Sequence, residues 1–121
     1  MKILIVDDSK AMRMIVTRTL RQAGFDNHDY LEACDGAEAL AVIAAERPDL
    51  VLSDWNMPEV NGIELLQRLR EAGDEVRFGF VTSESTDAMR ALAADSGALF
   101  LIAKPFTAET FAQALSGVLV G

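Results

Sequence analysis

Short apolar runs alternate with longer segments of helical spacing along this chain, and that alternation restricts the fold more than any other feature. Each run is rich in Ile, Val, Leu or Phe and is bounded by turn or charged residues, as buried strands are. The runs predicted to be strands cover residues 2–6, 28–33, 49–53, 76–82 and 99–103. The run over 28–33 is weaker and more polar, so we expect it near an edge of the sheet.

Five other segments place apolar residues three and four positions apart, which is the spacing of one helix face. The predicted faces are, in chain order, Met12, Ile15, Val16, Thr19, Leu20 and Ala23; Ala37, Leu40, Ala41 and Ala44; Leu65, Leu66, Leu69 and Ala72; Ala88, Met89, Leu92 and Ala93; and Phe111, Ala112, Leu115, Val118 and Leu119. Gly24 and Gly73 are placed to end the first and third helices, and Thr107 is placed to cap the fifth.

A strand followed by a helix, repeated along the chain, predicts a parallel sheet with right-handed crossovers. Because the strands are apolar throughout, both faces of the sheet are expected to be covered. We therefore predict an α/β fold, a flavodoxin-like doubly wound sheet of five parallel strands in the order 2-1-3-4-5 with five helices. A single domain is expected to span residues 1–121.

Charge and cysteine content exclude several classes of function. The chain has 11 basic and 19 acidic side chains and a net charge of −8, which argues against binding nucleic acid or anionic membranes. Its one cysteine, Cys34, cannot form an internal disulfide, and the apolar start of the chain is too short for a signal peptide or a membrane span. We expect a cytoplasmic monomer with no nucleic-acid or membrane partner.

Polar residues collect where the predicted strands end. The carboxyl ends of the strands form the binding edge of an open parallel sheet, so residues at these ends should lie together. The residues at four of these ends are Asp7 and Asp8, Asp54 and Asn56, Thr82, and Lys104.

Three carboxylates at one edge of the sheet predict a cation-binding site and a phosphoryl transfer that uses the cation. Clustered carboxylates repel one another, and oxygen ligands with room for water suit Mg2+. A carboxylate can also attack phosphorus to give an aspartyl phosphate, while a metal and a lysine neutralise the transferring oxygens. Taken singly, each of these residues is as easily explained as a turn or a helix cap, so the prediction depends on their joint placement.

Together, Asp7-Asp8, Asp54, Thr82 and Lys104-Pro105-Phe106 resemble the pattern of response-regulator receiver domains, and residues 53–58 and 61–66 are similar to the CheY-like single-domain subgroup. The resemblance covers the whole chain. It implies that Asp54 is the phosphoacceptor and that Mg2+ is held by Asp7, Asp8, Asp54 and the backbone carbonyl of Asn56. It also implies that Thr82 is a switch hydroxyl, that Lys104 binds the phosphoryl group, and that the Lys104-Pro105 peptide bond is cis.

The same resemblance implies a signalling module of a two-component system and not an enzyme with an external substrate. A sensor histidine kinase or a phosphotransfer protein would supply the phosphoryl group. The domain would catalyse only its own phosphorylation and dephosphorylation, and its altered surface would contact an unidentified target protein, with chemotaxis as a candidate pathway.

One position departs from the CheY-like pattern. An aromatic residue commonly lies three positions before the lysine in that subgroup, and this chain has Leu101 there, with Phe100 just before it. Side chains alternate along a strand, so Phe100 is expected to face the other side of the sheet. The family's aromatic switch is therefore not predicted to operate unchanged in this chain.

Three alternatives to this hypothesis stay open: a phosphatase or phosphotransferase with an aspartyl-phosphate intermediate, the receiver part of a larger regulator, and a receiver that only binds. Enzymes of the first class usually carry a second Asp two residues after the nucleophile, where this chain has Asn56, which cannot act as a general acid. Glu84 and Asn56 occupy positions where the family tunes dephosphorylation. His28 is expected to lie on the surface, and Cys34 to be a buried or partly buried small residue without a redox role.

Overall fold

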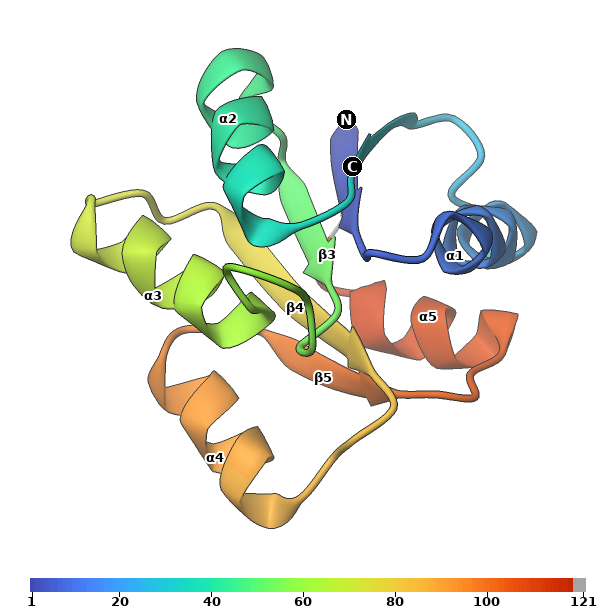
Figure 1. Cartoon of the computed structure of the whole chain (residues 1–121). Coiled ribbons are helices and arrows are strands. Elements are labelled where there is room, and N and C mark those ends of the chain that lie inside the picture. The colour runs from blue at the N-terminus through green and yellow to red at the C-terminus, as the bar shows by residue number, and fades with distance from the viewer. Residues whose placement is uncertain (119–121) are drawn as a thin grey trace.

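The computed structural model describes residues 1–118 and has the predicted alternation of strands and helices (Figure 1). The elements are β1 (Lys2–Val6), α1 (Lys10–Gln22), β2 (Asp29–Ala33), α2 (Gly36–Glu46), β3 (Leu50–Ser53), α3 (Gly62–Glu71), β4 (Arg77–Thr82), α4 (Asp87–Asp95), β5 (Phe100–Ala103) and α5 (Ala108–Leu115). The strands are parallel and ordered β2-β1-β3-β4-β5, which confirms the predicted topology.

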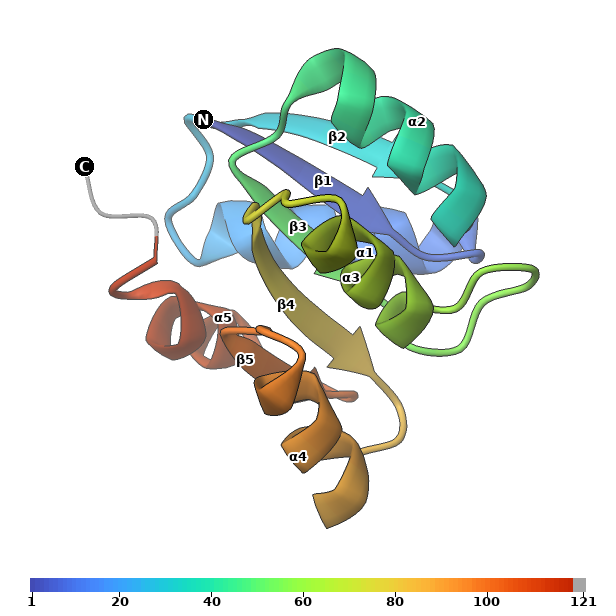
Figure 2. The same cartoon turned by 90° about the vertical axis from the view of Figure 1, so that its left-hand side faces the viewer.

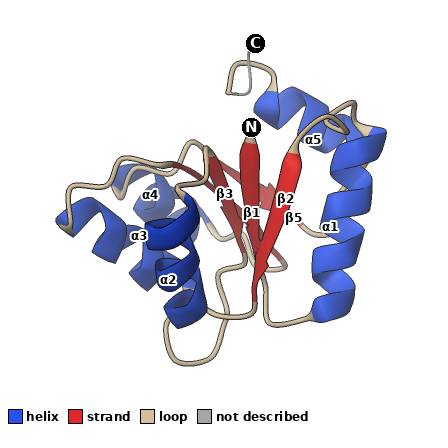
Figure 3. Ribbon diagram, turned by 90° about the horizontal axis from the view of Figure 1, so that it is seen from above, coloured by secondary structure: helices blue, strands red, loops and turns tan. Residues whose placement is uncertain are grey.

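Helices cover both faces of the sheet. Helices α1 and α5 lie on one face and α2, α3 and α4 on the other, as the view in Figure 3 shows. Figure 2 shows that β1 runs from the N-terminus toward the far end of the sheet and that its neighbours point the same way. All five strands therefore deliver their carboxyl ends to one edge of the sheet, the edge where ligands bind in such folds.

Alternate strand residues enter two separate core layers. Leu4 and Val51 belong to the layer beneath α2, α3 and α4, which we call the α2–α3–α4 layer. Ile3 and Leu50 belong to the layer beneath α1 and α5, the α1–α5 layer. All four side chains are completely buried. Two buried faces require apolar residues at successive positions, which is why the strands are continuous apolar runs in the sequence.

The predicted helix faces are wrong at positions on the first four helices. In α2 the predicted alanines are exposed, and the buried residues are Gly36, Ala39 and Ile43. This helix is apolar almost all round, so the spacing of its alanines does not identify the packed face. Ile15 and Leu92, also placed on the predicted faces, are 44% and 41% exposed, and Ala72 and Ala88 are exposed as well. Leu119 lies outside the described residues.

Each helix begins with a side-chain N-cap, and the capping residue lies in the loop that follows the preceding strand. The capping residues, whose side chains accept a hydrogen bond from a first-turn backbone amide, are Ser9, Asp35, Asn61, Thr86 and Thr107. The predicted cap at Thr107 is thus confirmed. Gly24 and Gly73 follow α1 and α3 with positive φ, as expected of residues that end a helix. The caps hold the loops at the binding edge in defined conformations.

Arg70 lies near the C-terminal end of α3, away from the binding edge. It connects α3 to the loops that precede β4 and β5. Its guanidinium donates to the carbonyl oxygens of Asp74 (2.8 Å), Val76 (2.9 Å) and Gly97 (3.2 Å). We expect Arg70→Ala to lower the free energy of unfolding by about 2 kcal/mol, because three carbonyls lose a charged donor. Urea denaturation checks this value. Arg68→Ala, on the exposed side of the same helix, is the control and should change stability by less than about 0.5 kcal/mol.

Candidate functional site

The three carboxylates predicted to meet at the carboxyl edge do meet there. Asp7 and Asp8 follow β1 and Asp54 follows β3, and each offers an oxygen within 4.8 Å of the others. Backbone hydrogen bonds continue the sheet past the strand ends, from the amide of Asp54 to the Val6 carbonyl and from the amide of Asp7 to the Ala33 carbonyl. The sheet itself therefore sets the distance between the first and third strand ends.

Lys104 enters this cluster from the end of β5. Its Nζ lies 3.2 Å from Asp7 Oδ2 and 3.6 Å from Asp54 Oδ2, and its side chain is 16% exposed. Its backbone amide donates to the carbonyl of Thr82 at 2.8 Å, and the Lys104-Pro105 bond is cis, as expected. One ammonium offsets one of three carboxylates, so two negative charges are left for a divalent cation with oxygen ligands. The residues present fit Mg2+.

Burial shifts the titration of Asp54. The residue is only 9% exposed, and this loss of solvent raises the pKa of its carboxyl group. The neighbouring carboxylate of Asp7 raises the pKa further, whereas Lys104 and the backbone amide of Trp55, 2.7 Å from Oδ1, oppose the rise. The ionised form of Asp54 is thus held in an environment that disfavours it, and a cation at the cluster would relieve this.

Thr82 ends β4 beside the cluster, with its side chain completely buried. Its hydroxyl oxygen accepts a hydrogen bond from the Glu84 amide at 3.3 Å. The side chain of Glu84 in turn accepts from Asn56 Nδ2 at 3.3 Å. This contact joins the loop after β3 to the loop after β4, so the two residues predicted to act on dephosphorylation are direct neighbours.

Arg13 is a site neighbour that the sequence analysis did not place among the functional residues. Its Nη1 donates to the backbone carbonyl of Asp7 at 2.6 Å, and its Nε pairs with Glu32 Oε1 at 2.9 Å. The partner at the site is a main-chain oxygen, which no sequence pattern reveals. The one available signal is a basic residue in the first turn of the helix that follows the acidic pair.

Leu101 and Phe100 lie on opposite faces of the sheet, as predicted. Leu101 packs against the α2–α3–α4 layer, whereas Phe100 packs against the α1–α5 layer. The Phe100 ring covers Gly79 so closely that a Cβ at Gly79 would lie 2.2 Å from Cε1 of the ring. Phe100 therefore fills a structural position and cannot substitute for an aromatic residue at position 101.

His28 and Cys34 take no part in the cluster. His28 precedes β2, at the opposite end of the sheet from Asp54; it is half-buried rather than on the surface, and its Nδ1 has no hydrogen-bond partner among residues 1–118. Cys34 is partly buried, as expected. A hydrogen bond to Glu38 is the main cause that raises the pKa of the Cys34 thiol, with burial and the nearby carboxylates adding to it. A raised pKa leaves less thiolate and makes this cysteine a poor nucleophile.

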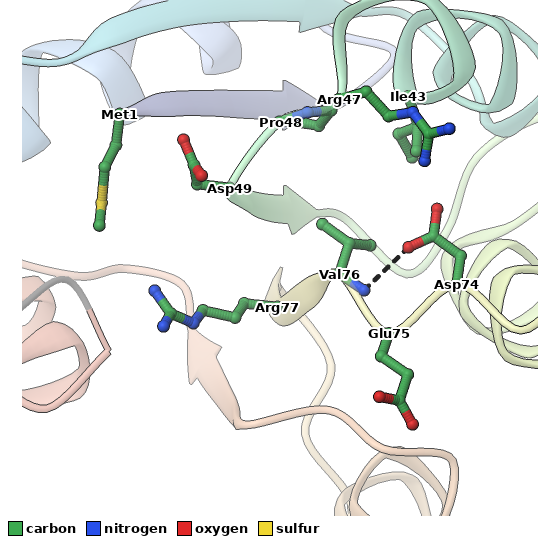
Figure 4. A pocket seen from close by; sticks show the side chains of 9 residues that line it. All are labelled: Met1, Ile43, Arg47, Pro48, Asp49, Asp74, Glu75, Val76 and Arg77. Atoms are coloured by element: carbon green, nitrogen blue, oxygen red, sulfur yellow. Dashed lines mark hydrogen bonds between the residues drawn. The ribbon is translucent and has the colours of Figure 1, made fainter.

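A hollow of about 420 Å3 lies away from the cluster, near the starts of β3 and β4 (Figure 4). It is bordered by Arg47 and Arg77 and by the carboxylates of Asp49 and Asp74, and the Asp74 side chain accepts from the Val76 amide at 3.0 Å. The border of the hollow thus carries charges of both signs, and these do not form a cluster like the one at the carboxyl edge. The cluster at the carboxyl edge, rather than this hollow, is therefore the candidate site.

This chain is similar to a family of receiver domains and to known chemotaxis proteins. The chain matches the family described as the response regulator receiver domain over residues 3–116. Chemotaxis protein CheY-3 of Vibrio cholerae serotype O1 is 41% identical over 121 residues, which cover 98% of this chain and 91% of that protein. A chemotaxis protein CheY homolog of Campylobacter jejuni is 38% identical over 122 residues, with 98% and 92% covered.

Solved structures agree with the sequence relatives. The structure of the Vibrio cholerae chemotaxis protein CheY4 superposes with a TM-score of 0.85 at 33% identity and covers 98% of both chains. The Francisella response regulator 1452 receiver domain also has a TM-score of 0.85, at 26% identity. Within residues 1–118, every helix is too short or too polar to cross a lipid bilayer.

Proposed function

This chain belongs to the response regulator receiver domain family, and from that premise we propose that Asp54 accepts a phosphoryl group beside a Mg2+ ion. The ion would be held by Asp7, Asp8, Asp54 and the backbone carbonyl of Asn56. The observation that carries the proposal is the cluster itself, three carboxylates within 4.8 Å of one another with Lys104 against two of them. Bound Mg2+ would offset the charge of the carboxylates and of the transferring phosphoryl oxygens.

Each residue of the cluster has a separate task in the proposed transfer. An oxygen of Asp54 forms a bond to phosphorus while the bond between phosphorus and the donor's imidazole nitrogen breaks, and the bonding electron pair stays on that nitrogen. Lys104 leaves its ion pair with Asp7 and binds an oxygen of the arriving group. The buried hydroxyl of Thr82 donates to another phosphoryl oxygen, which draws the end of β4 toward Asp54.

The reverse chemistry returns the domain to its resting state. Water replaces the Asp54 carboxylate at phosphorus, releases inorganic phosphate and restores the carboxylate. Asn56 and Glu84 lie in the two loops beside this path and are joined by a hydrogen bond, so they are placed to influence how water reaches the phosphoryl group. Both reactions occur on the protein's own side chain, so the domain is a signalling protein and not an enzyme with an external substrate.

The proposed partners follow from this chemistry. A sensor histidine kinase or a phosphotransfer protein supplies the phosphoryl group, and an unidentified protein target binds the altered surface. Because two of the relatives are named chemotaxis proteins, chemotaxis is the proposed pathway. A cytoplasmic monomer that contacts neither nucleic acid nor membrane is in keeping with a net charge of −8.

Labelled acetyl phosphate tests the proposal without requiring the natural kinase. We expect the protein to take up label when Mg2+ is present and to lose this ability in excess EDTA. The label should be released by hydroxylamine, as an acyl phosphate is. Uptake that continues without a divalent cation, or label that resists hydroxylamine, would contradict an Asp54 acyl phosphate formed with Mg2+.

A further inference from the structure

Arg13 holds the main chain between the two acidic residues at the end of β1. Its Nη1 donates to the backbone carbonyl of Asp7 at 2.6 Å, the short distance of a charge-assisted hydrogen bond. That carbonyl belongs to the planar peptide group that connects Asp7 to Asp8. The hydrogen bond therefore sets the orientation of the peptide from which both proposed metal ligands project.

The guanidinium is itself held by a second contact. Its Nε pairs with Glu32 Oε1 at 2.9 Å, and the Arg13 side chain is 14% exposed. Glu32 lies in β2 opposite Ile5 of β1, and its neighbour Ala33 accepts the Asp7 amide. One planar group thus spans from the edge strand β2 to the loop after β1, and its fork geometry satisfies two acceptors at once.

Asp7 is otherwise attached through its amide and its side chain. The amide binds the Ala33 carbonyl, Oδ1 accepts from the Ser9 amide at 2.9 Å, and Oδ2 faces Lys104. The Ser9 contact closes a turn around Asp8, but none of these three contacts holds the carbonyl oxygen of Asp7, which the Arg13 guanidinium binds. Asp8 is exposed, and the Arg13 hydrogen bond adds a side-chain restraint that links the peptide before Asp8 to Glu32 of β2.

We propose that Arg13 is a positioning residue for the metal site, which raises Mg2+ affinity by orienting the Asp7-Asp8 peptide. The proposal rests on the proposed function, because it assumes that Asp7 and Asp8 hold Mg2+. The effect of positioning on Mg2+ affinity is opposite to the effect that the positive charge of Arg13 would have by itself. A guanidinium near the cluster repels a cation, so a purely electrostatic role would make Mg2+ bind more tightly when Arg13 is neutralised.

Calorimetric titration of the full chain with MgCl2 at constant ionic strength tests this. We expect Arg13→Gln to weaken Mg2+ binding roughly tenfold, the lower end of the range for groups that orient metal ligands. Arg13→Lys should also weaken binding, because an ammonium keeps the charge but cannot reproduce the fork. Arg18→Gln, which removes an exposed charge from the same helix, is the matched control and should leave the affinity within about twofold.

Unchanged or tighter Mg2+ binding by Arg13→Gln would overturn the proposal, as would an Arg13→Lys protein with full affinity. Urea unfolding of each variant establishes that it is folded under the titration conditions, so lost stability is not read as lost affinity; if Arg13→Gln does not fold, Arg13→Lys decides. Mg2+ binding by the unsubstituted protein distinguishes failure of the positioning role from failure of the proposed function. If it binds Mg2+ but the Arg13 variants match it, only the positioning role fails, whereas absence of Mg2+ binding by the unsubstituted protein removes the proposed function as well.

Discussion

Asp54→Asn is expected to reduce label uptake from acetyl phosphate at least about 100-fold, because the amide cannot form the bond to phosphorus that the carboxylate forms. The substitution changes one oxygen to nitrogen at a side chain that is 9% exposed, so the surrounding packing is retained. Uptake is measured with Mg2+ present, by counting label after denaturing electrophoresis. Asp95→Asn, at the exposed end of α4, is the control and should be labelled like the unsubstituted protein.

The same variant should be more stable than the parent at neutral pH in a buffer without divalent cations. Burial raises the pKa of Asp54 in the folded state, so this carboxyl begins to oppose folding as the pH rises through its ordinary value and does so fully above the raised value. Asparagine carries no charge, and we expect a gain of roughly 0.5–2 kcal/mol in urea unfolding at pH 7. The gain should disappear near about pH 3, below the carboxyl's ordinary pKa, where aspartic acid is neutral in both states.

These two measurements can fail separately. A stable but fully labelled Asp54→Asn protein would mean that another side chain accepts the phosphoryl group. An unlabelled variant with no gain in stability at pH 7 would leave the phosphoacceptor assigned but would contradict the unfavourable burial of its charge.

Gly62→Ala is the second substitution expected to have a large effect. A Cβ at Gly62 would lie 2.2 Å from the carbonyl oxygen of Asp54, 2.9 Å from the Phe80 ring and 3.0 Å from the Cα of Trp55. Two of these three neighbours are backbone, so the methyl group can be accommodated only if the start of α3 moves. We expect a loss of about 3 kcal/mol in the free energy of unfolding, the upper end of the range for overpacking.

The start of α3 lies against the backbone of Asp54, the proposed phosphoacceptor, so Gly62→Ala should also slow label uptake in the fraction of protein that remains folded. Gly117→Ala is the matched control, because a Cβ there would have no neighbour within 4 Å. It should change stability by less than about 0.5 kcal/mol. A Gly62→Ala protein as stable as this control would mean that α3 can shift away from Asp54 at little cost.

Most of the architecture could be predicted because the strands carry an unusually clear signal. Both faces of β1, β3 and β4 are buried, so their apolar runs are continuous, and the predicted bounds of all five strands differ from the observed ones by no more than one residue, at the start of a strand. The face of α2 could not be predicted. Its alanines fit either side of a helix, and the choice is made by Gly36, which lies against the Val60 carbonyl where a Cβ would be only 2.5 Å away.

The cluster of Asp7, Asp54 and Lys104 could be predicted for a topological reason, since parallel strands bring their ends to one edge. The same reasoning could not predict that Arg13 contacts the site. Its two acceptors lie on different elements, and one of them is a main-chain oxygen that every residue type has. Contacts of side chains with the backbone are set by the path of the chain, and this path is known only once the fold is assembled.

The two core layers share no residue, and the backbone of the sheet lies between them. Side chains that do not contact one another and have no common neighbour contribute to stability almost additively. A substitution beneath α4, where Leu101 packs, therefore leaves the packing of α1 and α5 nearly unaffected. Related chains can diversify the helices on one side, and with them the partners they recognise, while the other side supplies a constant share of the folding free energy.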